Sequence, residues 1–199
     1  WAVTAIRREQ VDRCSSLAAE DGRPVAAVGG EDSAGSAVAA AVSVEAARAR
    51  AGDQMRTREF LSKLDHERII QAIHEAESKT SGEIRVLIER GKLKTDPLQT
   101  AQRRFQRLSM HKTRQRNAVL IFLAPRVHKF AVVGDNAIHE KCGGEFWDRV
   151  VERMRTHFQN EKFSDALIEA IKEIGSVLAR HFPKTVSDTN ELPDDVIES

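Results

Sequence analysis

Residues 118–124 read AVLIFLA, seven residues in a row without a polar side chain. A strand with apolar side chains on both faces is typical of the interior of a sheet that other layers cover on both sides. The run is also too short for a membrane-spanning helix, which needs about 20 apolar residues. This segment therefore predicts a central strand, and the rest of the chain must supply the layers that bury it.

Two further strands are predicted on either side of this segment in the sequence. Residues 83–89 alternate, with Ile84, Val86 and Ile88 on one face and mostly charged side chains on the other. A helix separates this strand from the central one, so the two should be parallel. Only PRVH separates the central strand from the strand expected at 129–133. This link is too short for a crossover, so the second pair should be antiparallel.

Helices are expected before, between and after these strands. Asp65 and Asp96 are good N-terminal caps, and a proline follows Asp96 at the first helical position. The order α-β-α-β-β-α-α predicts an α/β fold, a three-layer α/β/α sandwich with a small mixed sheet. The expected helices cover 65–78, 96–108 and 146–158, and a fourth begins at Ser164 or Asp165 and ends before Pro183.

Composition divides the chain of 199 residues into three parts. Residues 1–57 are rich in alanine and poor in large apolar side chains, so they predict a disordered segment. Two explanations fit this segment: a non-native or upstream-translated extension, or a flexible tether. Residues 58–183 should form the folded domain, and residues 184–199 form an acidic C-terminal tail.

The net charge of +1 conceals a basic domain. Residues 90–134 contain eleven Lys and Arg residues and a single acid, Asp96. Such a surface attracts phosphates, nucleic acid or anionic lipid head groups, although no nucleic-acid-binding motif accompanies it. The alternative is a solvated helix face that partly attracts the acidic tail. The tail, which contains Val196 and Ile197, should then pack loosely on the basic surface.

The sequence disfavours several classes of protein. No transmembrane segment is predicted, and no stretch combines a basic start, an apolar run and a small-residue cleavage site, so we expect a cytoplasmic protein. Two cysteines, Cys14 and Cys142, are too few for a disulfide scaffold or a zinc site. The neighbouring Lys141 favours a lower pKa for the Cys142 thiol, but no known hydrolase motif accompanies this cysteine, so a catalytic thiol is not expected. The sequence carries no signal for an oligomeric state.

The predicted segments resemble, in order and spacing, those of the TPM-domain family. The resemblance extends over residues 64–183. The segments that carry it are TSGEIRVLIE (80–89), RNAVLIFLA (116–124), KFAVVGDNAIHEKCGGEFWDRV (129–150), NEKFSDALIEAI (160–171) and HFP (181–183).

The resemblance implies an α/β/α domain and two kinds of function. A plant thylakoid member is described as an acid phosphatase, related members help to maintain or repair membrane protein complexes, and some members bind calcium. Members are often extracytoplasmic or membrane-anchored. One expectation is therefore a metal-dependent, phosphatase-like hydrolase that acts on phosphate esters. The alternative is a non-catalytic binding module that aids the assembly or repair of a protein complex.

Chain direction predicts a polar cluster at one edge of the sheet. The last strand should end at Asp135 beside Arg116 and Asn117, which precede the central strand, with Glu83 at the same edge. Arg116 and Asn117 are candidates for binding a phosphate-bearing substrate, since a guanidinium group grips phosphate with two hydrogen bonds.

The same edge suggests catalytic and metal-binding roles. Asp135 and His139 are the candidate catalytic residues, because an imidazole moves protons near neutral pH. The carboxylates of Glu83, Asp135 and Glu140 are candidate ligands for Ca²⁺ or Mg²⁺, which prefer oxygen. If this metal site exists, Asp135→Asn should weaken metal binding and leave the fold nearly as stable. The structural alternative is an ordinary turn residue at Asp135 and a solvated strand end at Glu83.

Overall fold

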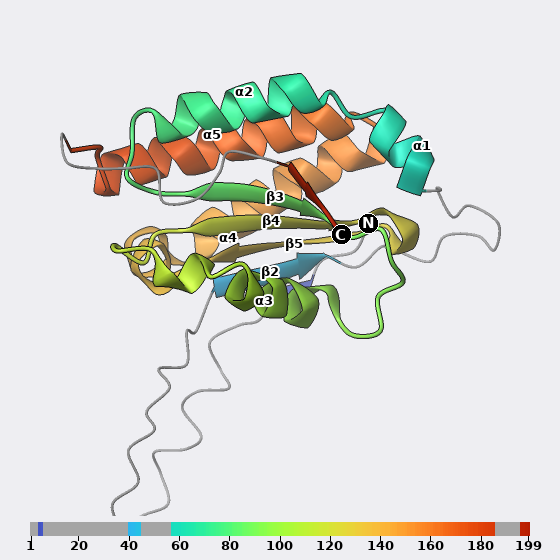
Figure 1. Ribbon diagram of the computed structural model, residues 1–199, viewed down its shortest axis with the longest axis horizontal. Coiled ribbons are helices and arrows are strands. Elements are labelled where there is room, and N and C mark those ends of the chain that lie inside the picture. The colour runs from blue at the N-terminus through green and yellow to red at the C-terminus, as the bar shows by residue number, and fades with distance from the viewer. Residues whose placement is uncertain (1–3, 6–39, 45–56, 186–195) are drawn as a thin grey trace, which may run out of the picture.

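The computed structural model describes residues 4–5, 40–44, 57–185 and 196–199. These residues form a six-stranded mixed sheet with helices on both faces (Figure 1), which confirms the expected α/β/α fold. The helices are α1 (Thr57–Ser62), α2 (His66–Glu77), α3 (Pro97–Arg107), α4 (Asn136–Gln159) and α5 (Phe163–His181), with 3₁₀ turns at Met110–Lys112 and Pro125–Val127. The strands are β1 (Thr4–Ala5), β2 (Ala40–Val44), β3 (Ile84–Ile88), β4 (Val119–Ala124), β5 (Lys129–Gly134) and β6 (Val196–Glu198).

The strand order is β1-β2-β5-β4-β3-β6. β3 and β4 are parallel, with Ile84 opposite Val119, and β4 and β5 are antiparallel, with Ala124 opposite Lys129. Both predicted pairings are therefore confirmed. β4 lies inside the sheet and all of its residues are buried, as the continuous apolar run predicts.

The two faces of the sheet bury different cores. On one face, α1, α2, α4 and α5 form the larger core with Ile84, Val86 and Ile88 of β3. On the other face, α3 packs on Leu87 of β3 and Leu120 of β4. Figure 1 shows α2 and α5 on one side of the sheet and α3 on the opposite side. The outer surface of α3 is thus left without a covering helix among the described residues.

Local capping chemistry sets where the helices begin. The carboxylates of Asp65 and Asp96 accept hydrogen bonds from backbone N–H groups in the first turns of α2 and α3, which confirms both predicted caps. The last helix begins at Phe163, earlier than expected. Ser164 does not cap it, because its hydroxyl oxygen accepts a hydrogen bond from the Asp65 N–H (2.9 Å) and links the starts of α2 and α5.

Helix α4 begins directly after β5, well before the helix start expected at residue 146. Asp135 caps it, since its Oδ1 accepts a hydrogen bond from the Asn136 N–H (2.8 Å). Gly143 interrupts the helix with a φ of 69°, a conformation that glycine adopts without steric cost. The apolar stripe that predicts a helix from Phe146 onward lies after this interruption.

Some strands lie outside the domain predicted at 58–183. β2 falls within residues 1–57 and pairs antiparallel with β5, while most of that segment lies outside the described residues. β6 belongs to the acidic tail and pairs in parallel with β3. Residues 196–199 of the tail therefore dock on a sheet edge, where Glu198 pairs with Arg90 of the basic segment, and residues 186–195 lie outside the described residues. None of the described helices has the length and apolar content needed to cross a bilayer.

Candidate functional site

Backbone hydrogen bonds bring three segments to the predicted edge of the sheet. The Asp135 N–H donates to the Ala118 carbonyl oxygen (2.9 Å), and the Val119 N–H donates to the Glu83 carbonyl oxygen (2.7 Å). The end of β5, the start of β4 and the residue before β3 thus lie side by side. Chain direction alone predicts this arrangement, because β3 and β4 are parallel and β5 is antiparallel to them.

A bidentate ion pair joins two of the candidate residues. Arg116 donates from Nε to Asp135 Oδ2 (2.8 Å) and from a terminal nitrogen to Oδ1 (3.0 Å). The Asp135 side chain is fully buried, whereas the Arg116 side chain is 41 % exposed. The hydrogen bond to Asp135 raises the pKa of Arg116 further above its ordinary value, against the opposing effect of burial. Two of the five N–H donors of the guanidinium group are therefore taken by the protein's own carboxylate.

Asp135 also fixes the backbone around it. Both of its carboxylate oxygens accept hydrogen bonds, because Oδ1 also binds the Asn136 N–H. In return, the Arg116 carbonyl oxygen accepts from the Ala137 N–H (3.2 Å), and Arg116 adopts a left-handed φ of 53°. These contacts tie the segment before β4 to the first turn of α4, so the pair acts as a structural bracket between them.

Asn117 lies deeper at the same edge. Its side chain is fully buried, and Nδ2 donates to the Ser81 hydroxyl oxygen (3.3 Å). Thr80 continues this connection by donating from Oγ1 to the Phe182 carbonyl oxygen and accepting from the Gly82 N–H. Asn117 therefore helps to hold the turn before β3 against the end of α5, and its side chain is buried away from any substrate in solution.

The remaining candidates lie around the Arg116–Asp135 pair. Glu83 is buried at the start of β3, contrary to the solvated strand end considered above, while His139 is half-buried on α4 and Glu140 is exposed. Within the described part of the chain, no three His, Cys, Asp or Glu side chains converge as metal ligands would. With both Asp135 oxygens occupied, the proposed trio of Glu83, Asp135 and Glu140 does not fit a Ca²⁺ or Mg²⁺ site as it is arranged here.

Close packing next to Asp135 leaves little room at this edge. A Cβ placed on Gly134 would approach the Trp147 ring to 2.7 Å. Trp147 is almost completely buried. Glycine is required at position 134 because the indole ring lies directly on the backbone and leaves no space for a side chain.

Several buried charges were not predicted by sequence reasoning. Glu83, Arg85 and Glu89 of the alternating pattern are all buried, although the pattern places them on the polar face of a half-buried strand. The face is covered because it is the one that α3 packs against. Arg104 of α3 forms an ion pair with Glu89. Glu77 of α2, another buried acid, accepts a hydrogen bond from the Ile84 N–H (2.6 Å).

The outer side of α3 carries the basic residues that the sequence singles out. Arg103 and Arg107 of α3 and Lys112 of the following turn are exposed, and no ion pair joins them to an acid within the described ranges. We call these three residues the α3 basic face. They differ from Arg104 and Arg116, which each have a carboxylate partner.

The prediction of a lower pKa for the Cys142 thiol is wrong. Burial raises the pKa of its thiol from 9.0 to about 11, although Lys141 is its neighbour in the sequence. Cys142 packs against the larger core, while Lys141 is exposed. A thiol in this environment remains protonated at neutral pH and is a poor nucleophile.

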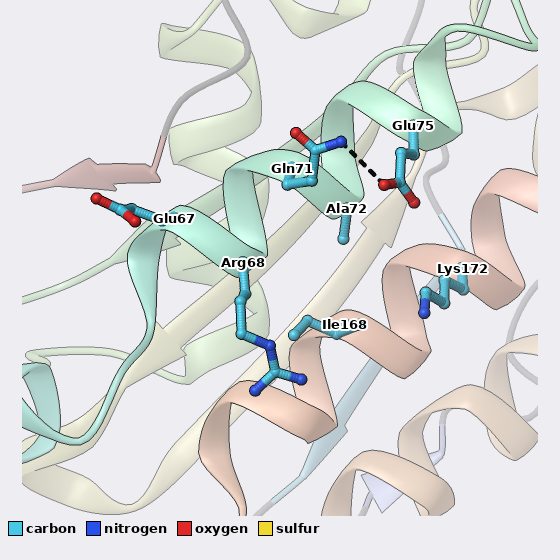
Figure 2. Close-up of a pocket in the computed structure, with 7 residues that line it drawn as sticks. All are labelled: Glu67, Arg68, Gln71, Ala72, Glu75, Ile168 and Lys172. Atoms are coloured by element: carbon cyan, nitrogen blue, oxygen red, sulfur yellow. Dashed lines mark hydrogen bonds between the residues drawn. The ribbon is translucent and has the colours of Figure 1, made fainter.

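A separate groove lies between α2 and α5 (Figure 2), away from the predicted edge. Its volume is about 400 Å³, and it is lined by charged and apolar side chains. Gln71 Nε2 donates to Glu75 Oε1 (2.9 Å) along α2 in this groove. The lining residues are Glu67, Arg68, Gln71, Ala72, Glu75, Ile168 and Lys172.

Comparisons with known proteins agree with this fold. The TPM domain family model matches residues 55–177, which is more than half of the chain, and the protein belongs to the TPM-domain family. The NMR structure of the BA42 protein from the psychrophilic bacterium Bizionia argentinensis is similar to this chain, with 33 % identity and a TM-score of 0.63. The similarity covers 67 % of this chain and 92 % of BA42. No curated protein gave a significant match.

Proposed function

We propose that this TPM domain is a non-catalytic binding module that aids the assembly of a protein complex, and that the α3 basic face contacts an acidic segment of a partner protein. The observation that carries the proposal is the contrast between two sets of basic residues. Arg116 is bound to a buried carboxylate, whereas Arg103, Arg107 and Lys112 are exposed and form no ion pair among the described residues.

The ion pair between Arg116 and Asp135 supports a binding module without catalytic activity. A metal-dependent hydrolase needs a carboxylate with a free oxygen for the cation and a cationic side chain free for the phosphate. Asp135 and Arg116 satisfy each other instead. Opening the pair would leave the fully buried Asp135 carboxylate without its counter-charge, which is strongly unfavourable.

The chemistry of the α3 basic face favours an acidic polypeptide over other anions. Binding to a membrane surface usually adds apolar side chains that enter the lipid, and the apolar residues of α3 are buried against the sheet. Ile70, the exposed large apolar residue of the described chain, lies on α2 in the opposite layer. Single-stranded nucleic acid usually stacks on aromatic side chains. The exposed positions of α3 carry none.

A binding assay tests the proposed surface. Fluorescence anisotropy with a labelled poly-glutamate peptide should show binding to the full chain that weakens with salt, since surface charges are screened. The triple variant Arg103→Gln, Arg107→Gln, Lys112→Gln should bind at least about tenfold more weakly, because three charges of the contact surface are lost. The matched control, Lys162→Gln, Lys172→Gln, Arg180→Gln, removes the same charge from exposed positions on and next to α5. Equal losses in both variants, or tighter binding to phosphatidylserine vesicles or an oligonucleotide, would overturn the proposal.

A second assay addresses the alternative, a metal-dependent phosphatase. The full chain is incubated with p-nitrophenyl phosphate and Ca²⁺, Mg²⁺ or no added metal. We expect no phosphate release above the blank. Release that depends on metal and is lost in Asp135→Asn, while that variant remains folded, would establish the hydrolase instead.

A further inference from the structure

The outer edge of β3 is covered by the short strand β6. Val196, Ile197 and Glu198 pair in parallel with Val86, Leu87 and Ile88, respectively. The next residue continues the contact, because the Ser199 N–H donates to the Ile88 carbonyl oxygen (3.1 Å) and the Arg90 N–H donates to the Ser199 carbonyl oxygen (2.7 Å). The edge of β3 thus receives an extended segment mainly through backbone hydrogen bonds, which any sequence can form.

Side-chain contacts add sequence preference to these backbone bonds. Val196 packs against the larger core on one face of the sheet, and Ile197 packs against the smaller core on the other face. Glu198 forms an ion pair with Arg90 and lies 3.5 Å from His66 Nε2. The edge therefore accepts two apolar residues followed by an acid, with the acid paired to Arg90 and close to His66.

The covering strand is short and only partly buried. Val196 and Ile197 remain half-exposed, and the Glu198 side chain is 26 % exposed. Their partners on the neighbouring strand, Val86, Leu87 and Ile88, are almost completely buried. An unpaired edge of this kind exposes apolar side chains and a row of unpaired backbone groups, and it is a template for strand addition. The side chains of Val196 and Ile197 are only partly buried against the edge, so another segment can compete with residues 196–199 for it.

We propose that the edge of β3 is a binding site for an extended segment of a partner protein with the pattern apolar, apolar, acidic, and that residues 196–199 occupy this site as an intramolecular competitor. The site is separate from the α3 basic face and does not depend on the function proposed for that face. The covalent connection gives residues 196–199 a high effective concentration at the edge, so an external segment binds weakly until the internal one is released.

A charge-swap experiment tests this site in the full chain. The probes are two fluorescein-labelled peptides, DDVIES, which repeats residues 194–199, and DDVIKS, in which lysine replaces the acid. Glu198→Lys weakens the internal segment and leaves Arg90 in place, so this variant should bind DDVIES at least about tenfold more tightly than the unchanged chain does. Arg90→Glu also weakens the internal segment but reverses the charge of the site, so it should prefer DDVIKS over DDVIES.

Controls separate this outcome from general charge effects. Arg180→Glu changes the same charge at an exposed position at the end of α5 and should behave as the unchanged chain does. Arg90 is itself exposed, so Arg90→Glu should fold, and thermal unfolding checks this. Equal preference of folded Arg90→Glu for the two peptides, or no binding to folded Glu198→Lys, would overturn the proposal. So would a dimer of the unchanged chain that Glu198→Lys abolishes, because the occupant would then be a second copy of this protein.

Discussion

Two groups of arginines from one basic stretch of the sequence have opposite roles in the fold. At the start of β4, Arg116 holds a fully buried carboxylate with two hydrogen bonds and joins β4 to α4. On α3, Arg103 and Arg107 point away from the core and are exposed. The presence of a carboxylate partner, and not the charge itself, therefore decides whether an arginine supports the fold or is available to bind another molecule. Removing the charge of Arg116 should therefore lower the stability of the fold, whereas removing the charges of Arg103 and Arg107 should lower the affinity for a partner.

The largest expected effect is on Arg116. Arg116→Met leaves the buried Asp135 carboxylate without its counter-charge, and we expect the free energy of unfolding to fall by about 3 kcal/mol, at the lower end of the range for such pairs because Arg116 is partly exposed. Arg103→Met is the matched control, and it should change the free energy of unfolding by less than about 0.5 kcal/mol. Urea unfolding followed by circular dichroism measures both values. Similar losses in the two variants would remove the distinction between the two groups.

The packing beside Asp135 should give the next largest effect. Gly134→Ala pushes a methyl group against the Trp147 ring, and we expect a loss of about 1–3 kcal/mol in the free energy of unfolding. Gly144→Ala is a useful control in α4, because nothing lies within 4 Å of its added Cβ. That variant should change the free energy of unfolding by less than about 0.5 kcal/mol, because Gly144 starts the part of α4 that follows the interruption at Gly143. Equally small changes for both substitutions would show that Trp147 does not press on Gly134.

A smaller effect is expected on the reactivity of the Cys142 thiol, which lies on α4, the helix that Asp135 caps. Because burial raises the pKa of the thiol to about 11, iodoacetamide should modify Cys142 slowly at neutral pH, and the rate should rise as the pH approaches 11. A folded-state pKa above the unfolded value of 9.0 contributes stability below pH 9 that is lost as the pH rises through 11. The Cys14→Ser variant isolates the signal of Cys142. Fast modification near pH 7 would show that Lys141, and not burial, controls the thiol.

The smallest effect on stability is expected at the α3 basic face. The triple variant Arg103→Gln, Arg107→Gln, Lys112→Gln should unfold at nearly the same urea concentration as the unchanged chain, while losing affinity for poly-glutamate. Relief of repulsion between neighbouring positive charges acts in the stabilising direction. A clear loss of stability would show that these residues support the fold, as Arg116 does.

Sequence patterns predict the central elements well because each has a strong local signal. The continuous apolar run at 118–124 identifies β4, and Asp65 and Asp96 identify two helix starts. The elements that sequence patterns miss are short or depend on tertiary contacts. β6 has only three residues, and β2 lies in an alanine-rich segment without the alternation that marks a strand. Neither gives a periodic signal long enough to detect.

The candidate site shows the same limit. Strand direction places Arg116 beside Asp135, but it does not reveal that their side chains bind each other. The alternation at 83–89 locates β3, yet it suggests that Glu83 and Arg85 face solvent. They are buried because α3 covers that face of the sheet, a contact between distant segments that local periodicity does not contain.

Arg116 and Asp135 form a structural bracket and not an open metal site. Differential scanning calorimetry of the unchanged chain and of Asp135→Asn, each with and without millimolar Ca²⁺ or Mg²⁺, distinguishes the two. We expect Asp135→Asn to lower the melting temperature, and we expect neither cation to change the melting temperature of either protein. This differs from the sequence-based expectation that Asp135→Asn leaves the fold nearly as stable. A cation that binds only the folded state raises its melting temperature. A cation-dependent rise in the melting temperature of the unchanged chain that disappears in Asp135→Asn would show that Asp135 belongs to a metal site.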